Sequence, residues 1–256
     1  MTTPKNDKGF TLVELAIVLI IYGLAIIAVL RAISVYTIEN NEDITREATD
    51  IVSASLREFS SPAFNNRYPC PADPTLGPGD ANYGLEDCSL PPREGYTEDS
   101  AGNKVPVADT VLIGAVPFRT LLNTDPAAMD AQGFPIIGVR RTKLTENATY
   151  DAWGNKLTYA VTLDMTNRNT FDPNEGRINI VDENDNNLLD RAGAAHFTIL
   201  SHGEDGVGAF ARSGERVTDC GNFVTNPNPN PVPGFTAPID QTENCMFEDG
   251  EFANGL

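Results

Sequence analysis

The sequence predicts an α+β fold in which one long N-terminal helix packs on an antiparallel β-sheet. Three observations support this fold class: an apolar run near the N-terminus, an amphipathic helical pattern directly behind it, and short β-rich runs in the second half of the chain. Of the 256 residues, 41% are apolar, which is enough for one substantial core and too much for a disordered chain. We therefore expect one globular domain behind a helical N-terminus.

Charge and residue usage exclude several classes of function. Acidic residues number 36 against 18 basic residues, so no basic surface is available for nucleic-acid phosphates, and we predict no nucleic-acid partner. The 2 histidines and 4 cysteines lack the spacings of zinc and thioredoxin-like sites. A hydrolase would need adjacent Ser201 and His202, whose side chains diverge, and the chain has no G-x-S-x-G elbow. We therefore do not expect an enzyme.

A polar leader, residues 1–9, precedes the apolar run FTLVELAIVLIIYGLAIIAVL, residues 10–30, whose single charge is Glu14. As a helix the run is about 32 Å long, the thickness of the hydrocarbon core of a bilayer. Lys5 and Lys8 lie in the leader, so the positive-inside rule places it in the cytoplasm and the chain behind the run across the membrane. The sequence therefore predicts a single-pass membrane protein.

The helical pattern continues over residues 31–60 and becomes amphipathic. Apolar residues recur there at spacings of three and four, with charged and polar residues between them. Pro62 ends the pattern, because proline lacks the amide hydrogen and disfavours helix in the preceding residue. We predict one helix from Phe10 to about Ser60, with its apolar stripe covering a soluble domain.

The globular domain is predicted to span residues 61–256. Its first part, residues 61–106, is rich in proline and glycine and predicts a long ordered loop with few strands. Residues 120–131 predict a short helix. Strands are expected in five β-rich runs, at residues 107–118, 133–141, 156–165, 176–184 and 194–203.

Four cysteines, Cys70, Cys88, Cys220 and Cys245, all lie beyond the apolar run, where an oxidising compartment would preserve disulfides. We favour the two local pairs, Cys70 with Cys88 and Cys220 with Cys245, because each would close a loop with little regular structure. Each closure contributes roughly 3 kcal/mol in the chain-entropy model. Four buried free thiols are the alternative.

The N-terminal sequence KGFTLVELAIVLIIYGLAI resembles the class III signal of type IV prepilins and of type II secretion pseudopilins. The resemblance implies that prepilin peptidase cleaves between Gly9 and Phe10 and then methylates the new amine of Phe10. It also implies that Glu14 meets the N-terminal amine of a neighbouring subunit during assembly. An unpaired carboxylate in hydrocarbon costs on the order of 3 kcal/mol, which such a pairing would relieve. Alternatively, Glu14 reaches the membrane interface within an ordinary anchor.

The same resemblance implies a pilin-like fold and a structural role in a filament. The chain would be anchored in the inner membrane, with its C-terminal domain in the periplasm, until it assembles. Its partners would be prepilin peptidase, other pilin or pseudopilin subunits and the assembly platform proteins. The sequence leaves open whether the filament serves secretion, adhesion or motility, or DNA uptake. The alternative function is a membrane-anchored periplasmic binding domain that is not assembled.

A second resemblance involves DAWGNKLTY, residues 151–159, and FTILSHGEDGVG, residues 197–208, which are similar to motifs of the major pseudopilin of type II secretion. That likeness implies a possible calcium site, for which Asp205 matches the family's aspartate and Asp219 is a substitute ligand. Two arginines stand where further acidic ligands would be expected, and we expect them to pair with the loop carboxylates in place of the metal. They are Arg212 and Arg216.

Overall fold

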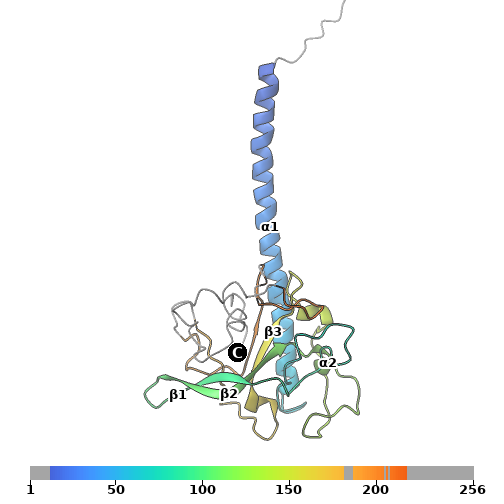
Figure 1. Ribbon diagram of the computed structural model, residues 1–256, viewed down its shortest axis with the longest axis vertical. Coiled ribbons are helices and arrows are strands. Elements are labelled where there is room, and N and C mark those ends of the chain that lie inside the picture. The colour runs from blue at the N-terminus through green and yellow to red at the C-terminus, as the bar shows by residue number, and fades with distance from the viewer. Residues whose placement is uncertain (1–11, 182–186, 205, 207, 218–256) are drawn as a thin grey trace, which may run out of the picture. The chain divides into compact units, whose positions relative to one another are not determined.

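The computed structural model describes residues 12–181, 187–204, 206 and 208–217. The chain divides into two compact units, Met1–Asp43 and Ile44–Leu256. Helix α1, Leu12–Ser60, which is blue to cyan in Figure 1, contributes to both units. Its 49 residues confirm the long helix that the apolar run and the amphipathic pattern predict, and it ends two residues before Pro62.

The second unit contains a four-stranded antiparallel sheet in the order β1-β2-β3-β4, so every strand pairs with its neighbours in the chain. Short helical turns follow β2 and flank β3. The α+β prediction and the pilin-like arrangement of helix and sheet are thereby confirmed. The strands are β1 (Arg93–Glu98), β2 (Lys104–Ala115), β3 (Thr158–Thr162) and β4 (Phe197–Leu200), and the short helices are α2 (Phe118–Leu121), η1 (Glu146–Thr149) and η2 (Leu163–Thr166).

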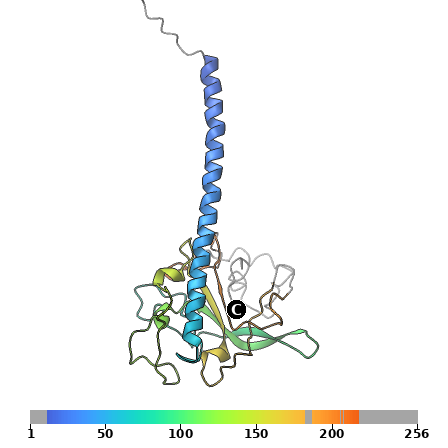
Figure 2. The same ribbon diagram turned by 180° about the vertical axis from the view of Figure 1, so that it is seen from behind.

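The main core lies between the C-terminal turns of α1 and one face of the sheet, which Figure 2 shows from the helix side. Ala48, Val52, Leu56 and Phe59 follow one another at helical spacing and are all buried. They pack in one cluster with buried side chains of β2, β3 and β4. The sheet members of this cluster are Leu112, Tyr159, Val161, Phe197 and Ile199.

The opposite face of the sheet is covered by irregular chain. Val111 of β2 and Ala160 of β3 form a smaller buried cluster with Ile178 and Ala195. Ile178 and Ala195 pair through backbone hydrogen bonds as an isolated bridge. Residues 176–184 therefore do not form the predicted strand within their described part, although Ile178 occupies an apolar position against the sheet.

The strand predicted at residues 133–141 is wrong for a different reason. Its backbone groups are bound by side chains and single backbone partners in place of a neighbouring strand. The Asn65 amide donates to the carbonyl of Ile137 and accepts its N–H, at 2.8 and 2.9 Å. Glu58 accepts the N–H groups of Arg140 and Arg141. The segment is apolar over most of its length, but among the described residues no strand of the sheet pairs with it.

Two further boundaries differ from the prediction. The short helix expected over residues 120–131 is α2, which begins earlier and ends at Leu121. The predicted loop at residues 61–106 contains β1 and the start of β2. The sequence did not predict β1, because its residues, REGYTE, are mostly polar and show no apolar alternation. β1 gains its order from pairing with β2 and from burial of Tyr96.

Within the described part of the chain, no helix combines the length and apolarity of a membrane span. Phe10 and several side chains of the predicted span at residues 10–30 lie outside that part. The transmembrane segment therefore stays a prediction, as do the leader at residues 1–9 and the domain limits at residues 31–60 and 61–256.

Candidate functional site

The N-terminal residues to which the resemblance assigns a function lie largely outside the described residues. This holds for Gly9 and Phe10, the proposed cleavage and methylation positions. The backbone of Glu14 lies in the first turn of α1, while its side chain is outside the described set. The function of this segment is therefore inferred from the sequence motif and from the exposed surface that follows it.

The first unit presents a large apolar surface to its surroundings. Nine large apolar side chains between residues 17 and 30 are each 52–65% exposed. A soluble monomer rarely leaves so much contiguous apolar surface in water, and large exposed apolar patches mark sites of interaction. The nine residues are Ile17, Leu19, Ile20, Ile21, Tyr22, Ile26, Ile27, Val29 and Leu30.

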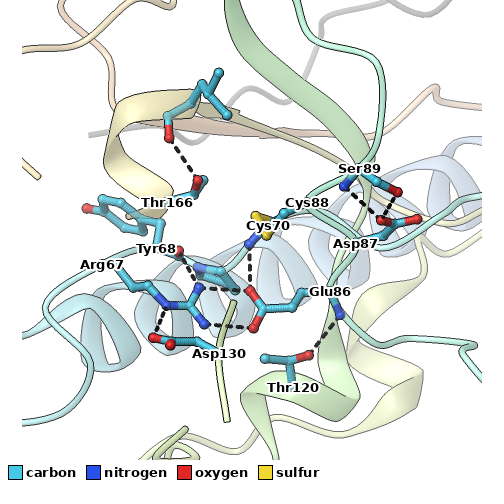
Figure 3. Close-up of a disulfide and its surroundings, with 12 residues drawn as sticks. Arg67, Tyr68, Cys70, Glu86, Asp87, Cys88, Ser89, Thr120, Asp130 and Thr166 are labelled. Carbon is cyan, nitrogen blue, oxygen red and sulfur yellow. Dashed lines mark hydrogen bonds and ion pairs between the residues drawn. A yellow bond between two sulfur atoms is a disulfide. The ribbon is translucent and has the colours of Figure 1, made fainter. Parts of the chain in front are cut away.

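The second unit is organised around a buried guanidinium, which Figure 3 shows beside the disulfide. Arg67 is 1% exposed and binds both oxygens of Glu86 through two parallel hydrogen bonds of 2.8 and 2.7 Å. Its Nε lies 3.3 Å from Oδ2 of Asp130, which also faces Arg168. Burial lowers the pKa of Arg67, but hydrogen bonds and charge from Glu86 and Asp130 raise it by more, so the pKa lies above its usual value. Arg67 is thus a permanently charged core residue.

The predicted disulfide between Cys70 and Cys88 is present, with Cα atoms 5.2 Å apart. Cys70 is buried and Cys88 is exposed. Glu86, two residues before Cys88, accepts the backbone N–H of Cys70 at 3.0 Å (Figure 3). The cross-link therefore holds the carboxylate of Glu86 against Arg67. The other predicted pair, Cys220 and Cys245, lies outside the described residues.

The two internal motifs, fifty residues apart in the chain, meet through Asp151 and Ser201. One oxygen of Asp151 accepts the N–H groups of Trp153 and Asn155, and Gly154 completes this turn at a φ of +87°. The other oxygen accepts the hydroxyl of Ser201 at 2.8 Å. Burial raises the pKa of Asp151, although these hydrogen bonds lower it. This contact ties the turn before β3 to the end of β4.

Ser201 and His202 are both fully buried and serve the same junction. The hydroxyl of Ser201 donates to Asp151, while Nε2 of His202 lies 3.0 Å from the hydroxyl of Thr158 on β3. This geometry explains why a serine and a histidine stand side by side without implying chemistry between them. The expectation that the chain is not an enzyme stays a prediction.

The arginines of the expected calcium loop find other partners. Arg212 forms an ion pair with Glu146 and lies over the ring of Tyr150, 5.4 Å from its centroid. Glu146 belongs to η1, so this partner of Arg212 lies outside the loop, and pairing of the arginines with the loop carboxylates stays a prediction. Arg216 lies 5.1 Å from the ring centroid of Phe210. The proposed metal ligands, Asp205 and Asp219, are outside the described residues.

A calcium titration tests the proposed metal site directly. We expect millimolar calcium to leave the melting temperature of this chain nearly unchanged, because cationic side chains occupy the neighbourhood of the loop. Differential scanning fluorimetry with calcium, with magnesium and with chelator measures this. A calcium-specific rise of many degrees that Asp205→Ala abolishes would instead establish the site.

Residues 4–30 match the prokaryotic N-terminal methylation motif. No curated protein and no solved structure matches the chain. The match coincides with the leader, the cleavage position and the exposed apolar part of α1. The chain therefore carries a prepilin-type N-terminal segment.

Proposed function

We propose that this chain is a structural subunit of a type IV filament. Prepilin peptidase cleaves it after Gly9, Phe10 becomes the methylated N-terminus, and the subunit assembles through α1. The observation that carries this proposal is the methylation motif at residues 4–30. The exposed apolar side chains that follow the motif support it, because they require an apolar surrounding that lipid supplies before assembly and neighbouring helices supply afterwards.

Within this class we favour a pseudopilus of type II secretion or a related system. The similarity of residues 151–159 and 197–208 to major pseudopilin motifs supports this choice, and the Asp151–Ser201 contact gives the two motifs a shared structural purpose. The long 61–106 segment and the cysteine-containing C-terminus favour a specialised or minor subunit. Inner membrane, assembly platform and other subunits are the partners that this function requires.

The decisive experiment is N-terminal sequencing of the membrane-extracted chain from cells with and without the peptidase. We expect the mature chain to begin at Phe10 only when the peptidase is present. Gly9→Val should leave the full-length precursor in the membrane, because a β-branched residue crowds the scissile peptide. Gly23→Val, which changes a glycine inside the apolar helix, is the matched control and should be cleaved normally.

An intact N-terminus in the presence of an active peptidase would contradict the proposal. That result would favour the alternative, a membrane-anchored periplasmic binding domain that is never assembled. Cleavage of the Gly9→Val variant at the same bond would contradict the assignment of this position.

A further inference from the structure

Lys156 is a buried lysine that bridges two separate loops. It follows the D-A-W-G-N turn directly and is only 5% exposed. Its backbone N–H donates to the carbonyl of Phe210 at 2.8 Å. Its Nζ donates to the carbonyls of Pro74 and Leu76, at 2.7 and 2.5 Å. One residue therefore binds the 209–217 segment through its backbone and the Cys70–Cys88 loop through its side chain.

The surroundings of Nζ are those of a cation site. An ammonium group has three N–H donors and no acceptor. Two of these donors bind the carbonyls of Pro74 and Leu76, and the ring of Tyr83, whose centroid lies 5.4 Å from Nζ, presents the negative face of an aromatic system. The hydroxyl of Tyr83 contacts Tyr150 and donates to Glu146, which fixes the ring.

Charge around the site also favours a cation. Burial lowers the pKa of Lys156 and the carboxylates of Asp73 and Asp80 raise it, and together they bring it to about 8. At neutral pH the group is thus mostly protonated. Burial lowers this pKa by more than the two carboxylates raise it, so their attraction offsets only part of the cost of dehydrating the cation. A cation that is not attached to the chain would therefore bind weakly at the same place.

The two loops held by Lys156 also approach each other closely. A Cβ added to Gly77 would overlap the carbonyl oxygen of Ser213, and one added to Gly214 would overlap that of Thr75. Gly214 has a φ of +91°, which favours glycine on its own account. This close approach restricts the backbone of residues 74–76, whose carbonyls at Pro74 and Leu76 both face Nζ of Lys156.

We propose that the carbonyl oxygens of Pro74 and Leu76 and the ring of Tyr83 form a cation-binding site that Lys156 fills from within the chain. The ligand class is a small cation of ammonium type, and the tethered amine makes a bound ion unnecessary for joining the two loops. Shortening the side chain should open the site to free ammonium. The competing explanation is that Lys156 contributes only its apolar stem to packing.

The test compares Lys156→Ala, which leaves space for an ion, with Lys156→Met, which fills the space without charge. Thermal unfolding of the full chain in detergent is followed by the fluorescence of Trp153, the only tryptophan. Ammonium chloride at hundreds of millimolar is compared with tetramethylammonium chloride, whose cation has no N–H group to donate to the carbonyls of Pro74 and Leu76. We expect both variants to melt lower than the natural chain, and ammonium to restore at least half of the loss in Lys156→Ala alone.

Lys143→Ala, which changes an exposed lysine, is the control and should show neither effect. A Lys156→Met variant as stable as the natural chain, or equal restoration by both salts, would overturn the proposal. If Lys156→Ala does not fold without salt, it is refolded in each salt. Native Trp153 emission in ammonium alone then supports the site, and its absence in both salts overturns it. None of these outcomes depends on cleavage after Gly9, so the filament proposal is tested separately.

Discussion

Cells whose only copy of this chain carries Glu14→Ala are expected to insert and cleave it normally but to yield few or no filaments containing it. Removing the carboxylate makes the apolar run more apolar, so insertion is not impaired. The pairing with the amine of a neighbouring Phe10 is lost, however, and with it a contact that relieves on the order of 3 kcal/mol of burial cost. Immunoblots of membrane and sheared-filament fractions measure both steps.

Glu39→Ala is the matched control, since it removes an exposed glutamate from the same helix outside the apolar run. It should leave filament yield near that of the natural chain. Normal yield from the Glu14→Ala chain would argue against the pairing and for a carboxylate that merely reaches the membrane interface. Restoration by Glu14→Asp would support the need for a negative charge at this position.

Arg67→Met is expected to lower the free energy of unfolding by about 3–5 kcal/mol, the usual cost of removing one partner of a buried ion pair. The change leaves the carboxylate of Glu86 without its bidentate partner and removes one of the two arginines that face Asp130. Urea unfolding of the detergent-solubilised chain, followed by Trp153 fluorescence, measures the loss. Arg67→Lys should recover only part of it, because an ammonium cannot bind both oxygens of Glu86 in the same plane.

Arg177→Met supplies the comparison for a surface pair. Arg177 binds Glu175, whose side chain is 55% exposed, so this change should cost at most about 1 kcal/mol. Equal losses for Arg67→Met and Arg177→Met would show that the buried cluster contributes no more than an ordinary surface pair. The disulfide is kept oxidised throughout, because it holds Glu86 in place.

Helical periodicity predicted α1 almost to the residue, because an apolar run followed by an amphipathic stripe has few other interpretations. The Cys70–Cys88 pair could also be predicted from the sequence, since a short loop rich in proline and glycine favours a local cross-link. Strand β1 could not be found in this way, because its order comes from β2 beside it and from burial of Tyr96. The reverse error occurred at 133–141, where an apolar run predicted a strand. There the side chain of Asn65 makes the hydrogen bonds to Ile137 that a neighbouring strand would make.

The functional residues show the same contrast between local sequence signals and contacts made by distant segments. Gly9, Phe10 and Glu14 were predicted from a short motif, because a processing enzyme would act on a linear sequence, and their roles stay predictions. The Arg67–Glu86–Asp130 cluster and the surroundings of Lys156 gave no such signal, since each joins segments that are distant in the chain. Arg212 shows the limit most clearly: its partner is Glu146, 66 residues away.

The order of the strands has a consequence for how the chain can fold as it is synthesised. Each strand pairs with the one before it, and the first cross-link closes within 18 residues. A chain whose segments become available in sequence order can therefore add each strand to a sheet edge already formed, without waiting for a later segment to be inserted. The apolar stripe of α1 is the exception, because it is synthesised first but packs largely against β3 and β4, which are synthesised later. Until these strands have formed, the nascent chain exposes the stripe, and it is then most prone to aggregation.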